Sequence, residues 1–236
     1  MQNQQAALYD LFYMSMKDYS AEAGQIADRI RRVRPHCRTL LDVGCGTGEH
    51  ARLLGEVHGF EVDGVDLDPA FVAIARAKCP RGRFDVADMV EFHLGRSYDV
   101  VLSLFGSIGY VVTLERLREA LACLRDHLVP GGVAIVEPFF TPDGFRDGTT
   151  GACTVEADGQ LVTRSHTLVR DGVRGQVQYR YTTRGPDGVR RWDEVHELGL
   201  FTVDEMLAAF SAVELAVTYQ PRGTLGDGIY VASALA

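Results

Sequence analysis

The glycine-rich segment at residues 40–50, LLDVGCGTGEH, constrains the fold more than any other part of this chain. An apolar run ends in an acidic residue, and glycines follow at three alternate positions, Gly44, Gly46 and Gly48. Glycine adopts positive φ readily and lets the backbone approach a ligand closely, whereas a tight turn alone needs only one or two glycines. In open α/β sheets the turn after the first strand commonly forms the ligand site. The segment therefore predicts a strand, a ligand-binding turn and a helix.

Strand-like and helix-like segments alternate through the first 140 residues. Short apolar runs predict strands, and apolar residues at helical spacing predict amphipathic helices between them. This alternation predicts an α/β fold with a doubly wound, Rossmann-like, mostly parallel sheet and right-handed crossovers. The strands are expected at residues 38–43, 60–68, 83–89, 98–105 and 132–138, with an early helix at residues 20–34.

Capping residues mark where several helices begin. Asp68 stands directly before a proline, which predicts a helix that starts there and runs to about residue 79. Thr113 is the expected N-cap of a helix whose leucines continue to Leu128, before the segment VPGG. Thr202 and Glu205 form a predicted capping box for one more helix. The caps and the apolar spacing together place these helices between the strands.

The pattern changes after residue 140. Long runs of alternating polarity at residues 153–201 are broken by Asp-Gly, Arg-Gly and Gly-Pro-Asp-Gly turns, which are typical of antiparallel hairpins. We therefore expect an inserted antiparallel β meander. The predicted divisions are N-terminal helices and an α/β core at residues 1–140, the meander on the substrate side at residues 141–200, and a return to the core at residues 201–236, with strands at 213–220 and 228–234.

Charge and cysteine content limit the classes of function. The 236-residue chain has a formal net charge of -8 and a pI of about 5.4, which argues against binding to nucleic acid or to an acidic membrane. Residues 1–10 lack an apolar segment, and no apolar run approaches the ~18–20 residues of a membrane span. Five cysteines without a C-x-x-C pair indicate a reducing cytoplasm, and no metal site is expected.

The residues around the glycines distinguish among ligands. A nicotinamide or flavin fingerprint, G-x-G-x-x-G, would place a small residue where this chain has Glu49. A carboxylate at that helix N-terminus would repel a pyrophosphate. A phosphate-binding P-loop is excluded because no Gly-Lys-Ser/Thr follows. The turn therefore suits a ligand with an adenosine and a positive centre but no phosphate, which indicates S-adenosylmethionine (SAM).

Four motifs, in order, resemble those of class I SAM-dependent methyltransferases. They are LLDVGCGTG, the acid Asp66 at the end of the second strand, ADM at residues 87–89, and PGG before the fifth strand. The resemblance implies that Asp66 holds the ribose hydroxyls, that Asp88 accepts from the adenine amino group beside an apolar wall at Met89, and that Asp42 has an indirect, structural role near the methionine end. The implied cofactor-binding residues are Tyr13, Tyr19, Asp42, Gly44, Gly46, Gly48, Asp66, Leu67, Asp88, Met89 and Leu104.

Further segments resemble a narrower family. YDLFY and KDYSAEA near the N-terminus, LFGSIGY, VEPFFTPDGF and the meander together resemble the N,N-dimethyltransferases of TDP-linked 3-amino-deoxysugars, of the desosamine and mycaminose type, over almost the whole chain. These enzymes act in antibiotic biosynthesis and are often dimers, which suggests a homodimer here. In that family the N-terminal aromatic segment closes over SAM, and the meander forms part of the sugar-nucleotide site.

The narrower resemblance implies an acceptor and a chemistry. The expected activity is N-methylation of the amino group of a TDP-amino-sugar by in-line methyl transfer, with S-adenosyl-L-homocysteine as product. The implied catalytic residues are Tyr110, Tyr13, His166 and His196, although nothing in the sequence pairs either histidine with a partner. The implied acceptor-binding residues are Phe105, Ser107, Tyr110, Glu137, Phe139, Phe140, His166, Arg184, Glu194 and His196.

The sequence departs from this family at three places. Tyr110 stands where the sugar enzymes have a histidine that is proposed to help the amine lose its proton, and a phenol with a pKa near 10 is a poor base at neutral pH. The segment MSM before Lys17 is shorter than the Gly/Arg-containing segment expected, and Asp227 replaces an arginine. Arg164, Arg184 or Arg222 could supply the positive charge that a pyrophosphate needs.

Other functions therefore stay open at this point. One is a SAM-dependent O- or N-methyltransferase that acts on another small natural product or on a peptide, which the two missing cations favour. Another is a nucleotide-binding oxidoreductase, which Glu49 disfavours, or a non-catalytic SAM-binding module.

Overall fold

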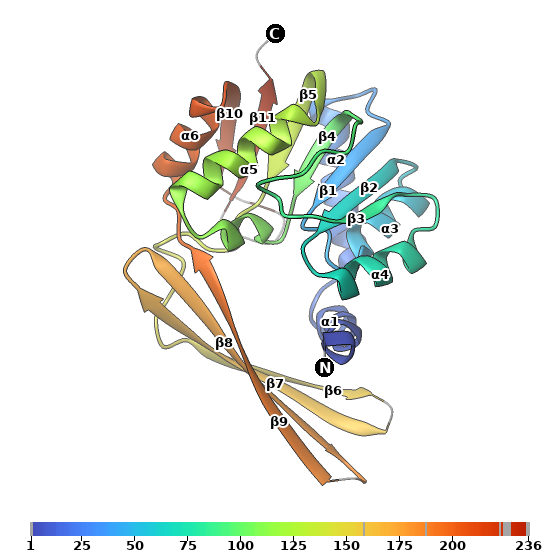
Figure 1. Cartoon of the computed structure of the whole chain (residues 1–236), viewed down its shortest axis with the longest axis vertical. Helices are drawn as coiled ribbons and strands as arrows, with labels where there is room; N and C mark the ends of the chain where they lie inside the picture. The colour runs from blue at the N-terminus through green and yellow to red at the C-terminus, as the bar shows by residue number, and fades with distance from the viewer. Residues whose placement is uncertain (1, 158, 187, 222, 224–227, 235–236) are drawn as a thin grey trace.

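The computed structural model describes residues 2–157, 159–186, 188–221, 223 and 228–234. It contains a seven-stranded sheet with helices on both faces and a separate four-stranded antiparallel sheet that projects from one end of it (Figure 1). The predicted α/β fold with an inserted antiparallel meander is therefore confirmed. Among the helices described, none is long and apolar enough to cross a membrane.

The seven-stranded sheet is mostly parallel and carries the glycine-rich turn near its middle. Its strand order is β10-β11-β5-β4-β1-β2-β3. Only the pairs that involve β11 are antiparallel. The strand order reverses between β1 and β4, and ligands of open α/β sheets bind at such a switch point. The strands are β1 (Thr39–Val43), β2 (Glu61–Asp66), β3 (Phe84–Val86), β4 (Tyr98–Ser103), β5 (Leu128–Val136), β10 (Leu215–Gln220) and β11 (Ile229–Ala234).

Helices cover both faces of this sheet because its strands alternate buried side chains between two cores. Leu40 belongs to the core under α2 (Tyr19–Val33), α3 (Glu49–Glu56) and α4 (Pro69–Lys78). Its neighbour Leu41 belongs to the core under α5 (Leu114–Asp126) and α6 (Val203–Ala212). Both leucines are fully buried. Strand β1 is therefore packed against a buried core on both faces, which fixes the position of the turn that follows it.

The predicted helix caps are present, and each satisfies a backbone N–H group of the first turn. The Asp68 carboxylate accepts from Ala70 N, and the Thr113 hydroxyl accepts from Arg116 N. Thr202 and Glu205 form the reciprocal capping box.

Three predicted boundaries were wrong. Helix α5 ends at Asp126, and Leu128 begins β5, so the PGG segment lies within that strand rather than before it. A register shift between Tyr98 and Val100 accommodates the extra residues of β5. The third strand spans only Phe84–Val86, because Asp88 instead forms an isolated bridge with Glu91.

The antiparallel sheet consists of β6 (Thr150–Ala157), β7 (Gln160–Asp171), β8 (Arg174–Gly185) and β9 (Gly188–Gly199), paired in that order. Its long hairpins extend away from the larger sheet (Figure 1). Helix α1 (Gln2–Met16) packs against this meander, with the Phe12 and Tyr181 rings 6.1 Å apart.

Helix α1 is also tied to the α/β core. The Asp10 carboxylate accepts from the Thr47 hydroxyl in the glycine-rich turn at 2.5 Å and forms an ion pair with Lys78 of α4 at 2.7 Å. The helix therefore contacts both the meander and the turn after β1, and it lies beside the space between them.

Candidate active site

The three glycines of the turn all adopt positive φ, at 76° for Gly44, 55° for Gly46 and 77° for Gly48. A Cβ on Gly44 would lie 2.5 Å from the Ser107 Cβ, and one on Gly48 would lie 2.9 Å from the Ala75 Cβ. A Cβ on Gly46 would meet nothing within 4 Å. Close neighbours therefore leave no room for a side chain at Gly44 or Gly48. Gly46 has open space beside it, so its backbone is accessible. A bare backbone of this kind suits close approach by a ligand.

Asp66 braces the same turn from the end of β2. One carboxylate oxygen accepts from Gly46 N at 2.8 Å, and the other accepts from Asp68 N at 2.9 Å. Burial raises the pKa of Asp66, and the backbone hydrogen bonds oppose that rise. Because a carboxylate can accept about four hydrogen bonds, Asp66 retains acceptor capacity for hydroxyls of a ligand, and its role in binding the ribose stays a prediction.

Asp42 is a buried acid at the end of β1. Burial, together with the nearby Asp66, raises its pKa to about 7. Two carboxyl groups so placed stabilise positive charge nearby. The residues of the turn therefore fit a ligand that combines vicinal hydroxyls with positive charge, which is the combination that SAM presents.

The prediction that the Glu49 carboxylate repels a pyrophosphate did not take account of its neighbours in the fold. It is buried, and its carboxylate pairs with Arg52 at 2.5 Å and Lys78 at 3.1 Å. Burial opposes its ionisation, but these hydrogen bonds outweigh that effect and lower the pKa of Glu49. Two cations thus balance its charge, so repulsion by Glu49 alone does not exclude a phosphate.

The predicted adenine-binding turn lies beside the same space. Asp88 forms an ion pair with Arg116 of α5 at 2.8 Å and accepts from Val90 N at 3.2 Å. Met89 is half-buried next to it. An adenine amino group at this position would share the Asp88 carboxylate with Arg116.

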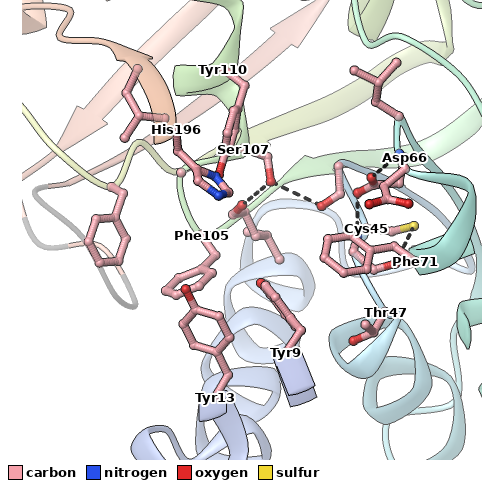
Figure 2. A pocket seen from close by; sticks show the side chains of 18 of the residues that line it. Tyr9, Tyr13, Cys45, Thr47, Asp66, Phe71, Phe105, Ser107, Tyr110 and His196 are labelled. Carbon is pink, nitrogen blue, oxygen red and sulfur yellow. Dashed lines mark hydrogen bonds between the residues drawn. The ribbon is translucent and has the colours of Figure 1, made fainter. Parts of the chain in front are cut away.

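A large cavity joins the carboxyl ends of β1, β2 and β4 to α1 and the meander. Its volume is about 780 Å³, which is within the range of cofactor and substrate sites. Figure 2 shows side chains from these elements around it. The structure brings together eighteen predicted site residues in its lining: Tyr13, Tyr19, Asp42, Gly44, Gly46, Asp66, Leu67, Asp88, Met89, Leu104, Phe105, Ser107, Tyr110, Phe139, Phe140, His166, Glu194 and His196.

Three predicted site residues lie elsewhere. Gly48 packs under α4 and meets the Ala75 side chain instead of the cavity. Glu137 is fully buried just after β5. Arg184 is exposed and is paired with Leu161 and Val189 near the hairpin tip of the meander, far along β8 from the core. These positions do not line the cavity, and the prediction that they contact a ligand does not follow from the structure.

Ser107 lines the cavity but is already engaged by the backbone. Its hydroxyl lies 3.1 Å from the Gly44 carbonyl oxygen and 3.0 Å from the Leu104 carbonyl oxygen (Figure 2). The single hydroxyl proton can be donated to either. Ser107 therefore connects the glycine-rich turn to the segment after β4.

The Tyr110 phenol forms a hydrogen bond with a histidine of the meander. Its oxygen lies 2.7 Å from His196 Nδ1 (Figure 2), and His196 Nε2 lies 3.4 Å from the Glu194 carboxylate. Trp192 Nε1 donates to the other oxygen of Glu194 at 3.2 Å. A row of side chains thus connects the cavity wall to a fixed carboxylate.

Tyr110 lines the cavity, and 54% of its surface is exposed. The surrounding protein raises its pKa through burial and through Tyr13. The phenol is therefore protonated at neutral pH.

One face of the meander supplies several further residues of the cavity lining. Arg164 lies opposite Tyr181, and His166 lies opposite Tyr179. Tyr179 in turn lies opposite Glu194. Alternate residues of a strand share a face, so the spacing of residues 164 and 166, of 179 and 181, and of 194 and 196 was a readable signal. The lining residues that the sequence did not predict include Tyr9, Phe71, Tyr179 and Tyr181, whereas Arg164 was one of three arginines considered for a pyrophosphate.

Arg164 is a buried cation in this face. Its guanidinium lies 4.7 Å from the Tyr13 ring centroid, 4.8 Å from that of Phe12 and 5.0 Å from that of Tyr179. Only 6% of Arg164 is exposed. Beside it, burial and the Arg164 charge lower the pKa of His166, which favours the neutral imidazole.

The segment after β4 is strained. Phe105 has φ of 51°, an uncommon conformation for an aromatic residue that costs of order 1–3 kcal/mol. Its ring carries the Lys17 ammonium 3.5 Å from the centroid, and Lys17 also pairs with Glu22 at 3.0 Å. Such strain is concentrated at functional sites. In this conformation the Phe105 ring faces the Tyr13 ring, with the two centroids 5.2 Å apart.

Metal ligands are not clustered in the part of the chain that the structure describes: no group of three or more His, Cys, Asp or Glu residues there could hold an ion.

Comparison with known proteins identifies the class. Residues 40–132 match the methyltransferase domain family. A dTDP-3-amino-3,4,6-trideoxy-alpha-D-glucopyranose N,N-dimethyltransferase of Streptomyces venezuelae is 40% identical over 228 residues, which are 96% of either chain. The crystal structure of DesVI from Streptomyces venezuelae has a TM-score of 0.90 and 39% identity, with 98% of both chains covered. SAM-bound CalS10, an amino pentose methyltransferase from Micromonospora echinaspora, has a TM-score of 0.83 and 36% identity, with 93% of this chain and 92% of that one covered.

The fold, the glycine-rich turn and these matches define a SAM-dependent methyltransferase, as the sequence predicted. Within that class the chain belongs to the family of TDP-amino-sugar N,N-dimethyltransferases. When bound, SAM supplies an electrophilic methyl group on a positively charged sulfur. The residues positioned to hold it are Gly44, Gly46 and Asp66, with Asp42 beneath them.

Proposed function

We propose that this enzyme methylates the amino group of a TDP-linked amino-deoxysugar in natural-product biosynthesis, and that it adds two methyl groups in succession. The observation that carries the proposal is the extent of the similarity: 40% identity runs over 96% of both chains. The matched region therefore includes α1 and the meander, which wall the acceptor side of the cavity, as well as the SAM-binding core.

The acceptor side has the character that such a substrate needs. Phe139, Phe140, Tyr179 and Tyr181 provide aromatic surface for the sugar and the nucleoside, and Tyr110 and Glu194 provide polar groups.

Arg164 is the cation that we assign to the pyrophosphate. Of the three arginines that could supply this charge, Arg164 lines the cavity and Arg184 does not. Arg222 and Asp227 lie outside the described residues. A buried guanidinium is well suited to a pyrophosphate because its planar donors bind two oxygens at once.

The chemistry places two demands on the chain. The amine must present its lone pair in line with the methyl–sulfur bond, which is a matter of positioning. It must also lose a proton, because an ammonium group has no lone pair. The cavity holds both acceptor-orienting residues and candidate proton acceptors near Tyr110.

The direct test is an assay with SAM and a panel of TDP-amino-sugars that differ in the position of the amine, read by mass spectrometry. We expect an acceptor whose mass increases by one and then two methyl groups. Matched TDP-sugars with a hydroxyl in place of the amine should gain none. If no member of the panel gains a methyl group while the enzyme binds S-adenosylhomocysteine by calorimetry, the substrate proposal is wrong and the class assignment stands.

A second candidate is a SAM-dependent O- or N-methyltransferase of another small natural product or of a peptide. One observation favours it: of the two arginines that line the cavity among the described residues, Arg116 is already paired with Asp88. A single remaining arginine suits an acceptor with less negative charge than a nucleoside diphosphate. Inhibition by TDP distinguishes the two candidates, because only a site for a TDP-sugar should bind the nucleotide competitively with the acceptor.

A further inference from the structure

We propose that Tyr110, His196 and Glu194 form a proton relay that removes a proton from the acceptor ammonium group before each methyl transfer. The relay deepens the proposed function and rests on it, because the acceptor nitrogen is taken to bind beside Tyr110. It gives a defined role to a tyrosine at a position where the amino-sugar enzymes that this chain resembles have a histidine.

The hydrogen bonds define the order of the groups in the relay. Tyr110 has one hydroxyl proton, and its oxygen lies 2.7 Å from His196 Nδ1. When the phenol donates to Nδ1, the neutral imidazole carries its proton on Nε2, 3.4 Å from the Glu194 carboxylate. Glu194 is held in turn by the Trp192 indole N–H at 3.2 Å. A base oriented by a third group is the arrangement that activates nucleophiles in many enzymes.

The proton transfer balances without a tyrosinate. The ammonium N–H bond breaks and its electron pair stays on nitrogen, while the proton passes to the Tyr110 oxygen. The Tyr110 O–H bond breaks at the same time, and its proton passes to His196 Nδ1. The free amine and an imidazolium remain, with the imidazolium next to Glu194. His196 then releases the proton to solvent, and the monomethylated ammonium group can use the relay again.

In this arrangement the weak basicity of a phenol does not prevent proton transfer. Tyr110 need not ionise, because its oxygen accepts one proton as it donates another. The group that changes charge is His196, because a neutral imidazole with its proton on Nε2 can accept a second proton on Nδ1.

Several charged or titratable groups face His196 from the packed elements. Tyr110 faces it from the 3-10 turn η1 (Ser107–Val111), and Glu194 from its own strand β9. The Tyr179 ring of β8 lies 5.2 Å from the imidazole, and Arg164 lies beyond Tyr179. The opposite residue on β8, Val177, is apolar. The pH profile of the enzyme therefore reports this set of groups together, with His196 as the one that accepts the proton in the relay.

The first experiment removes the base but keeps the hydrogen bond. His196→Asn retains an acceptor for the Tyr110 hydroxyl and cannot take a proton, and Tyr110→Phe removes the hydroxyl. Single-turnover rates of the first methylation should fall about 100-fold at pH 7 in both variants. The loss should shrink towards pH 9–10, because the amine is then deprotonated in solution. Affinity for S-adenosylhomocysteine should stay within twofold of the wild type, which shows that the variants are folded.

The second experiment tests the order of the relay by rescue. Tyr110→His places a base directly at the cavity wall, so the double variant Tyr110→His/His196→Asn should recover at least tenfold over His196→Asn alone at pH 7. Asp193→Asn is the matched control, since Asp193 neighbours Glu194 but pairs with Arg180 on the exposed face. That control should keep the wild-type rate and pH profile.

The outcomes separate the relay from the proposed function. If no TDP-amino-sugar is turned over by the wild type, the substrate proposal fails. If one is turned over and His196→Asn matches the wild-type rate between pH 6 and 8, the relay is overturned. A His196→Asn loss that Tyr110→His does not rescue, and that is equal at pH 7 and pH 9.5, also overturns it in favour of a structural role.

Discussion

The two halves of the cavity are built in different ways. The cofactor half is made by one continuous turn, in which positive φ at Gly44, Gly46 and Gly48 shapes the backbone and Asp66 braces it. The acceptor half is made by side chains from segments far apart in the chain, and the hydrogen bond between Tyr110 and His196 spans 86 positions. Backbone shape therefore defines the first half, and register between strands defines the second. Substitutions should affect the two halves differently.

The largest expected effect is on the backbone of the cofactor half. Gly44→Ala adds a Cβ that meets the Ser107 Cβ at 2.5 Å in a positive-φ conformation. Strain of about 1–2 kcal/mol and overpacking of about 1–3 kcal/mol together should lower the free energy of unfolding by roughly 2–5 kcal/mol in urea titrations. Gly46→Ala, with open space at its Cβ, should show the strain alone. Equal losses in the two variants would contradict this account of the turn.

The second effect concerns the buried acid beneath the turn and depends on pH. Asp42 has a folded-state pKa of about 7 against an ordinary value of 3.8. The folded state thus binds the proton more tightly, so the unfolding free energy falls as pH rises from about 4 to 7 and is level beyond. Asp42→Asn should raise that energy by about 2–4 kcal/mol at pH 8 and leave it unchanged at pH 3.5. A pH-independent effect in thermal or urea unfolding would show that Asp42 acts by packing.

The third effect is a loss of cofactor affinity that leaves acceptor binding unchanged. Asp66→Ala removes the carboxylate that holds Gly46 N and that is predicted to bind the ribose. Loss of charge-assisted hydrogen bonds of about 1.5–3 kcal/mol should weaken S-adenosylhomocysteine binding roughly 10- to 100-fold by calorimetry. The KM of the acceptor at saturating SAM should change little. Unchanged affinity in this variant would mean that the ribose lies elsewhere.

The smallest expected effect is a change in acceptor binding without a change in cofactor binding, which is the converse of the Asp66 result. Arg164→Met keeps the packing between the aromatic rings and removes the charge. The KM of a TDP-amino-sugar should rise about tenfold, with binding of S-adenosylhomocysteine unaltered. Arg184→Met, at an exposed position outside the cavity, serves as the control and should match the wild type. Reversed behaviour of the two arginines would remove Arg164 from the pyrophosphate site.

The same difference explains what could be read from the sequence. The strand, the glycines and Asp66 were predicted because backbone conformation and helix caps depend on residues close together in the chain. The PGG segment was misplaced because the register shift in β5 depends on β4, which a local pattern does not reveal. Glu49 was assigned a repulsive role although Arg52, three residues further along the same helix, is a readable ion-pair partner. Its second partner, Lys78 of α4, becomes visible only in the folded chain.

The acceptor half was predicted as a set of residues but not as an arrangement. His196 had no partner in the sequence, and Arg164 was one of three equal choices. The pairing of β7, β8 and β9 puts alternate residues of three strands on one face, which brings both residues to the cavity, and η1 then places Tyr110 beside His196. Alternation predicts which residues share a face of a strand, whereas the partner across the sheet depends on register.

Helix α1 belongs to both halves at once. Asp10 bonds to Thr47 in the glycine-rich turn, and Phe12 packs on Tyr181 of the meander. A ligand that fixes this helix from either side therefore alters the wall that the other ligand meets. Thermodynamic reciprocity then requires that the factor by which SAM changes acceptor affinity equals the factor by which the acceptor changes SAM affinity. Helix α1, of 15 residues, is thus a shared wall through which binding in one half of the cavity can influence binding in the other.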